Sequence, residues 1–69
     1  MTPYMLRQLW TVVDQTQTNL LLTLDESSLS RWLIRQLSMD RSLSTQETDT
    51  FEHYIRSKIP LIRDLAQTR

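Results

Sequence analysis

The fold is decided by residues 44–67, which read STQETDTFEHYIRSKIPLIRDLAQ. The stretch begins as helices do: the Ser44 hydroxyl can accept a hydrogen bond from the backbone of Glu47, whose side chain can reach back to Ser44. Apolar residues then recur every three or four positions, the spacing of one helix face. They are Phe51, Tyr54, Ile55, Ile59, Ile62, Leu65 and Ala66. This pattern predicts a helix over residues 45–67.

Pro60 interrupts that helix. Proline lacks a backbone N–H donor and disfavours the α conformation of the residue before it, here Ile59. The apolar face nevertheless keeps its phase from Ile55 to Ile62. We therefore expect the helix to be kinked or restarted at Pro60, with a first part to about Lys58.

A second helix is predicted over residues 3–23. Thr2 is suited to cap its start, and Pro3 then occupies the first helical position, where a missing N–H costs nothing. Leu6, Leu9, Trp10, Val13, Leu20 and Leu24 follow helical spacing. Short polar and β-branched residues at 14–19 weaken the helix locally. We expect one helix, with a break near residues 18–19 as the alternative.

The third predicted helix covers residues 26–38, with Asp25 as its N-cap. Leu29, Trp32, Leu33 and Leu37 form its apolar face. The link back to residue 23 is short, which favours an antiparallel pair.

These patterns predict an all-α fold. The chain has 69 residues and contains no glycine, the residue that tight β-hairpin turns favour. We expect residues 1–69 to form a single helical domain, a three-helix antiparallel bundle. Its core should consist of Leu9, Val13, Leu20, Leu29, Trp32, Leu33, Leu37, Phe51, Ile55, Ile59 and Ile62.

The composition argues against an enzyme and against a bound metal or cofactor. There is no cysteine, which excludes disulfides, thiolate metal ligands and a cysteine nucleophile. The single histidine, His53, has no carboxylate cluster beside it and makes a poor metal site. Without glycine, neither a nucleophile elbow nor a phosphate-binding loop can form. We expect no catalytic activity, no cofactor and no small-molecule substrate.

The charges balance, with eight Lys and Arg against eight Asp and Glu. A nucleic-acid-binding protein usually carries a basic excess, so such a partner is the weaker alternative. It would use Arg31, Arg35, Arg56, Lys58 and Arg63, if these residues merged into one patch across two neighbouring helices.

The setting is predicted to be cytoplasmic. The longest unbroken apolar run is residues 20–22, far short of the ~20 residues of a membrane span. The first residues lead directly into a helical pattern and do not resemble a secretory leader.

Two runs resemble small uncharacterised cyanobacterial helical proteins. They are LLLTLDESSLSRWLIRQL, residues 20–37, and YIRSKIPLIRDLA, residues 54–66. The resemblance implies a bacterial cytoplasmic protein. It implies no activity and no functional residue.

The helix lengths favour a protein–protein interaction or regulatory adaptor module that associates with itself, as a homodimer. The two outer predicted helices span about 30 Å, whereas the middle one spans about 20 Å. A short helix cannot cover two long apolar stripes, and an uncovered stripe usually marks an interface. We expect the partner-binding residues to include Leu6, Trp10, Leu61 and Leu65.

Overall fold

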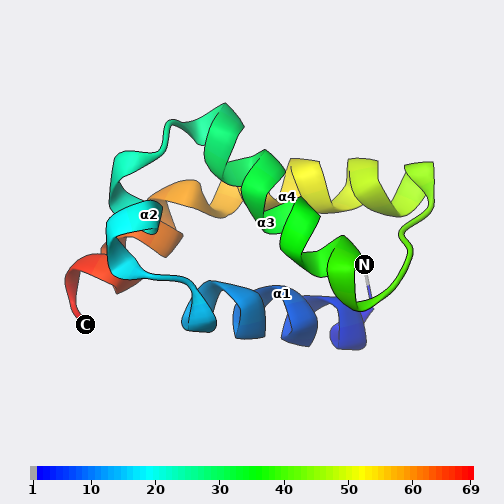
Figure 1. Ribbon diagram of the computed structural model, residues 1–69, viewed down its shortest axis with the longest axis horizontal. Helices are drawn as coiled ribbons and strands as arrows, with labels where there is room; N and C mark the ends of the chain where they lie inside the picture. The colour runs from blue at the N-terminus through cyan, green and yellow to red at the C-terminus, as the bar shows by residue number, and fades with distance from the viewer. Residues whose placement is uncertain (1) are drawn as a thin grey trace.

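The computed structural model describes residues 2–69, which form four helices and no strand. These are α1 (Pro3–Gln15), α2 (Thr18–Thr23), α3 (Glu26–Asp40) and α4 (Thr45–Gln67), as Figure 1 shows. The predicted all-α class is confirmed. The number of helices is four, rather than the three that the sequence pattern predicts.

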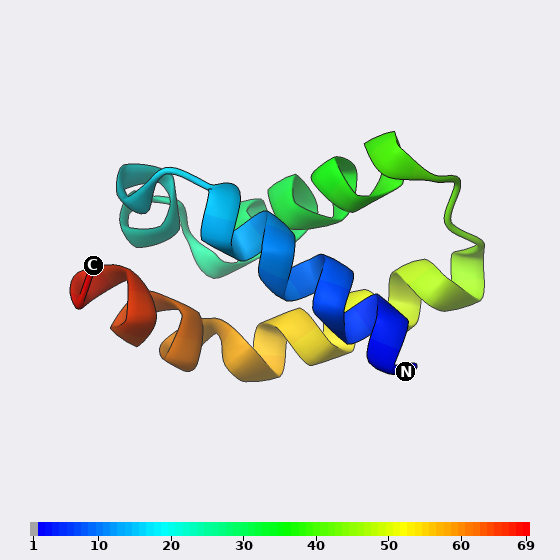
Figure 2. The ribbon, with the colours of Figure 1, turned by 90° about the horizontal axis from the view of Figure 1, so that it is seen from below.

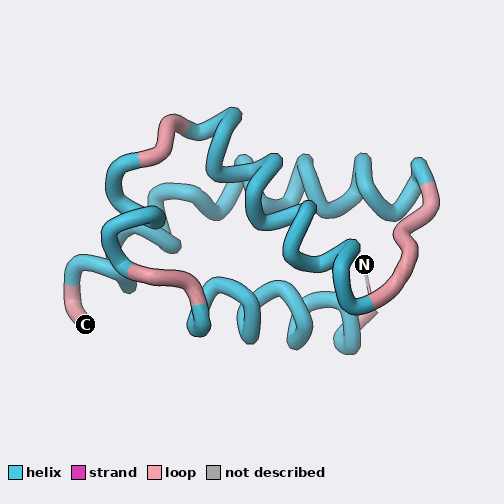
Figure 3. The backbone as a smooth tube through the Cα atoms, in the orientation of Figure 1, coloured by secondary structure: helices cyan, strands magenta, loops and turns pink. Residues whose placement is uncertain are grey.

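Helix α3 lies against both α1 and α4, and the short α2 packs on α4. Figure 1 shows α3 running in the opposite direction to α1 and α4. In the view from below, α1 crosses over α3 and α4 (Figure 2). Short loops join α1 to α2 and α2 to α3, and a longer loop joins α3 to α4 (Figure 3).

The core lies between the helices and is almost entirely aliphatic. Nine of the eleven predicted core residues are buried. They are Leu9, Val13, Leu29, Leu33, Leu37, Phe51, Ile55, Ile59 and Ile62. Met5, Leu21 and Ala66 complete it. The prediction for Leu20 is wrong, because its neighbour Leu21 points inward and is fully buried. Trp32 is only half-buried.

The prediction of one helix over residues 3–23 is also wrong, because the chain leaves the helical conformation at Thr16. The Thr16 hydroxyl donates to the carbonyl of Val12 at 2.7 Å, and its backbone N–H bonds to Val13 at 3.2 Å. Its backbone is extended, with φ −79° and ψ 140°. Helix α2 therefore starts anew at Thr18, which explains why Leu21 rather than Leu20 faces the core.

The helices end without a residue in the left-handed conformation, since no residue from 2 to 69 has a positive φ. The last carbonyls of a helix need donors from elsewhere. Arg69 supplies them for α1, donating to the carbonyls of Val13, Asp14 and Thr16 at 2.8, 3.2 and 2.7 Å. Arg63 donates to the carbonyl of Leu24, at the end of α2, at 2.6 Å. Two arginines near the C-terminus of the chain thus cap the C-terminal ends of α1 and α2.

Helix α4 continues through Pro60, so the alternative in which the helix restarts there is wrong. Pro60 is exposed, and the backbone bond that it removes lies on the solvent side of α4. Figure 2 shows the helix curved along its length.

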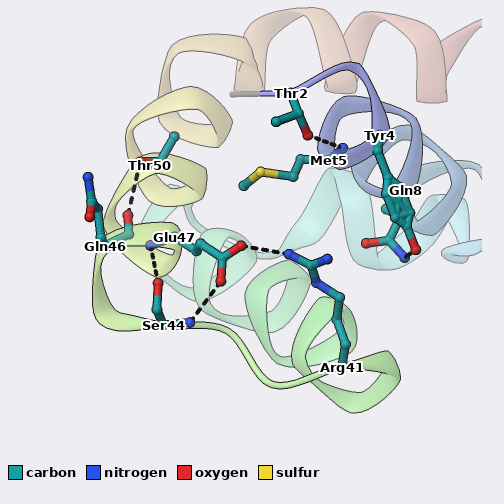
Figure 4. A network of polar contacts seen from close by, with 9 residues as sticks. All are labelled: Thr2, Tyr4, Met5, Gln8, Arg41, Ser44, Gln46, Glu47 and Thr50. Carbon is teal, nitrogen blue, oxygen red and sulfur yellow. Dashed lines mark hydrogen bonds and ion pairs between the residues drawn. The ribbon is translucent and has the colours of Figure 1, made fainter.

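The predicted capping box at the start of α4 is confirmed. The Ser44 hydroxyl accepts from the Glu47 backbone at 3.1 Å, and Glu47 accepts from the Ser44 backbone at 3.0 Å (Figure 4). The second Glu47 oxygen pairs with Arg41 at 2.6 Å, and the Arg41 guanidinium lies 5.7 Å from the ring centre of Tyr4. The box therefore joins the α3–α4 loop to α4 and to α1.

This network predicts a pH-dependent contribution of Glu47 to stability. The hydrogen bond from the Ser44 backbone, with the charge of Arg41, lowers the pKa of Glu47 below 4.5. A lowered pKa in the folded state adds stability above the unfolded value, and this stability is lost as the pH falls through the folded value. Thermal unfolding followed by circular dichroism should show Glu47→Gln less stable than the wild type near neutral pH. The gap should shrink below pH 4.5; a gap that stays constant in acid would contradict this role.

The arginine caps give a second prediction. Arg63→Met removes a charged donor from the Leu24 carbonyl, and such bonds contribute about 1.5–3 kcal/mol. We expect urea unfolding to show a loss of about that size. Arg31→Met is the matched control, because Arg31 is exposed and forms no ion pair or hydrogen bond among the described residues. It should change stability by less than about 0.5 kcal/mol. If both variants changed the free energy of unfolding equally, the hydrogen bond from Arg63 to the Leu24 carbonyl would not contribute to stability.

Candidate interaction surfaces

The first surface is formed by α1 and α4, the two helices on which the four predicted partner-binding residues lie. Leu61 and Leu65 are 44% and 48% exposed, and Leu6 and Trp10 are half-buried. The Trp10 indole N–H donates to the Tyr54 hydroxyl at 3.3 Å, which ties α1 to α4. We call this surface the α1/α4 face and define it by Leu6, Trp10, Tyr54, Leu61 and Leu65.

The difference in helix length explains why this face is uncovered. Tyr54, Leu61 and Leu65 follow helical spacing and share one side of α4. Helix α4 has 23 residues and α1 only 13, which correspond to about 35 Å and about 20 Å. Helix α1 meets α4 at Tyr54 and is too short to cover all of this side. Leu61 and Leu65, about two and about three turns farther along, remain exposed to solvent.

The basic residues of the nucleic-acid alternative do not share one set of contacts. Arg56 pairs with Glu52 at 3.3 Å, and the Lys58 ammonium lies 5.8 Å from the ring centre of Tyr54. Arg63 donates a hydrogen bond to the Leu24 carbonyl.

The pair on α3 lies together. Arg31 and Arg35 are exposed and line a shallow hollow with Ser28 and Trp32.

Sequence reasoning missed the capping role of Arg63. The available signal was the lack of glycine, which leaves helix ends in need of a donor. Nothing in the local pattern identifies an arginine 39 positions away as that donor.

Sequence reasoning also missed a second surface, in the groove between α1 and α3. We call it the α1/α3 groove. It has a volume of about 260 Å³. Its lining consists of Val12, Gln15, Thr16, Trp32, Gln36 and Met39.

An adjoining hollow extends the groove along α1. It shares Val12 and Gln15 with the groove and adds Tyr4, Arg7, Gln8 and Thr11. Tyr4 is 52% exposed and Met39 74%. The usable signal was Trp32, whose periodicity places it on the apolar face of its helix but does not show whether a neighbour covers it.

No group of three or more His, Cys, Asp or Glu side chains that could hold a metal occurs in the described part of the chain. His53 is exposed and lies in a hollow with Asp49, Glu52 and Arg56. Among residues 2–69, no helix is long and apolar enough to cross a membrane.

Comparison with known proteins returns no match from protein-family models, curated proteins or solved structures. The resemblance to cyanobacterial helical proteins thus stays a prediction.

Proposed function

We propose that this protein is a non-catalytic protein–protein interaction module that associates with itself through the α1/α4 face. One observation supports the proposal above others: Leu61 and Leu65 are nearly half-exposed on the same side of α4. Trp10 and Tyr54 extend the same face with two large aromatic rings. Exposed apolar residues that share one side of a helix favour an interface, and tryptophan and tyrosine are common at binding hot spots.

The size of the chain supports self-association. A domain of 69 residues buries only about 60% of the surface that its unfolded chain exposes. Without disulfides, a second copy is an economical source of additional burial. Symmetric dimers are the commonest oligomers, and their two subunits use the same surface. In such a dimer, Leu61 and Leu65 of each copy would be covered by the α1/α4 face of the other.

The proposed setting is the bacterial cytoplasm. Small secreted domains commonly depend on disulfides, and this chain has no cysteine.

We prefer a protein partner to a nucleic acid. The net charge is zero, and of the five basic residues Arg56 is ion-paired and Arg63 caps α2. Titration with random duplex DNA at low salt separates the two, because phosphate contacts release counterions and weaken steeply as salt rises. Strong, salt-sensitive binding lost in Arg31→Glu would favour the nucleic-acid alternative.

Analytical ultracentrifugation tests the proposed dimer. The wild type should shift from monomer to dimer as its concentration rises from about 1 to about 100 µM, a range that covers micromolar affinities. Leu61→Glu places a charge in the apolar face and should keep the chain monomeric. Leu61 is not in the core, so the circular dichroism spectrum should be unchanged.

Met39→Glu is the matched control, because Met39 is an exposed apolar residue in the α1/α3 groove. This variant should still dimerise. A wild type that remains monomeric at about 100 µM, or a dimer that tolerates Leu61→Glu, would refute self-association through this face.

A further inference from the structure

The cations of this chain divide into two classes by what they contact. Arg41, Arg56 and Arg69 form ion pairs with carboxylates. Arg63 caps α2, and Lys58 lies over the Tyr54 ring. The remaining three, Arg7, Arg31 and Arg35, are exposed, and their guanidinium groups form no ion pair or hydrogen bond with the side chains and carbonyls that the structure describes.

These three arginines lie around one surface. Arg7 lines the hollow that adjoins the α1/α3 groove and shares Val12 with it. Arg31 and Arg35 line a hollow on the other side, which shares Trp32 with the groove. The α1/α3 groove is thus bordered by cations along both α1 and α3.

The groove itself carries no charge. Its lining combines the apolar Val12, Trp32 and Met39 with the neutral side chains of Gln15 and Gln36. A neutral floor with basic edges matches a partner that has an apolar stripe flanked by carboxylates. An amphipathic helix laid between two helices presents its side chains in this way.

We propose that the α1/α3 groove binds an amphipathic helix of another protein whose apolar stripe is flanked by aspartate or glutamate. The apolar stripe would contact Trp32 and Met39, and its carboxylates would pair with Arg7 on one side and with Arg31 and Arg35 on the other. This surface lies on the opposite flank of α1 from the α1/α4 face, so the interaction does not depend on self-association.

The chain's own surface does not supply such a helix. The exposed stripe of Leu61 and Leu65 is flanked by Lys58 and by the exposed Asp64, each three positions from Leu61, so only one of its two flanks is acidic. The acidic Glu52 is paired with Arg56 and lies off that stripe. The partner is therefore a different chain.

The test uses a synthetic peptide of about 16 residues, enough to span α1 as a helix. It carries leucine at helical spacing and glutamate on both flanks. The matched peptide has lysine in place of every glutamate. Fluorescence anisotropy should show saturable binding of the glutamate peptide to the full chain, and binding of the lysine peptide at least tenfold weaker. Higher salt should reduce this preference, because the paired charges are near solvent.

Variants locate the site. Met39→Glu, and separately the double variant Arg31→Glu with Arg35→Glu, should weaken binding of the glutamate peptide at least tenfold. Leu61→Glu, on the α1/α4 face, should leave it unchanged. All these residues are exposed, and circular dichroism checks that each variant is folded.

The proposal is overturned if neither peptide binds up to about 1 mM, the limit of weak specific affinity. It is equally overturned if both peptides bind alike, or if Leu61→Glu abolishes binding while Met39→Glu does not. A monomeric wild type that binds the glutamate peptide would refute self-association and leave this groove interaction standing.

Discussion

The absence of glycine determines how the helices of this protein end. Many helices close on a residue in the left-handed conformation, usually glycine, which satisfies the last carbonyls. Here the residues after α1, α2 and α3 are extended, and the carbonyls at the ends of α1 and α2 take hydrogen bonds from Arg69 and Arg63. Arginine suits this task because its planar guanidinium offers several donors at once. The C-terminal part of the chain therefore holds the N-terminal helices in place.

The use of arginines in the fold also decides which charges remain for binding. Arg63 and Arg69 are occupied in capping, and Arg41 and Arg56 are paired with glutamates. The other three, Arg7, Arg31 and Arg35, form no ion pair with a described side chain, and they line the hollows that adjoin the α1/α3 groove. The length of α4 decides which apolar residues remain exposed, because α1 is too short to cover Leu61 and Leu65. Two chemically different surfaces thus arise on the two flanks of α1, one apolar and one neutral with basic edges.

Local signals in the sequence were enough for much of this structure. The capping box at Ser44 and the apolar face of α4 depend on residues close in sequence, and both were predicted correctly. The end of α1 was not predicted correctly, because it involves Arg69, which is 53 positions away from Thr16 in the sequence. The misplacement of Leu20 followed from that error. Periodicity placed Trp32 on the correct face of its helix, but only the packing of α1 beside it shows that the ring is half-open.

The surfaces, too, could be predicted only where they depend on local spacing in the sequence. Leu61 was expected among the partner-binding residues, and the structure finds it exposed. The sequence could not show which arginines cap helices and which remain without an ion pair, because these roles depend on contacts between helices. The sequence pattern contains no indication that Arg63 caps α2 while Arg31 stays unpaired.

The two tryptophans report separately on the two surfaces, since Trp10 belongs to the α1/α4 face and Trp32 to the α1/α3 groove. Their indole N–H signals can be followed by nuclear magnetic resonance while the protein is diluted from about 1 mM to about 10 µM, a range that spans micromolar affinities. Self-association through the α1/α4 face predicts that the Trp10 signal shifts with concentration and that the Trp32 signal stays in place. A shift of Trp32 with Trp10 unchanged, or no shift of either signal, would contradict it.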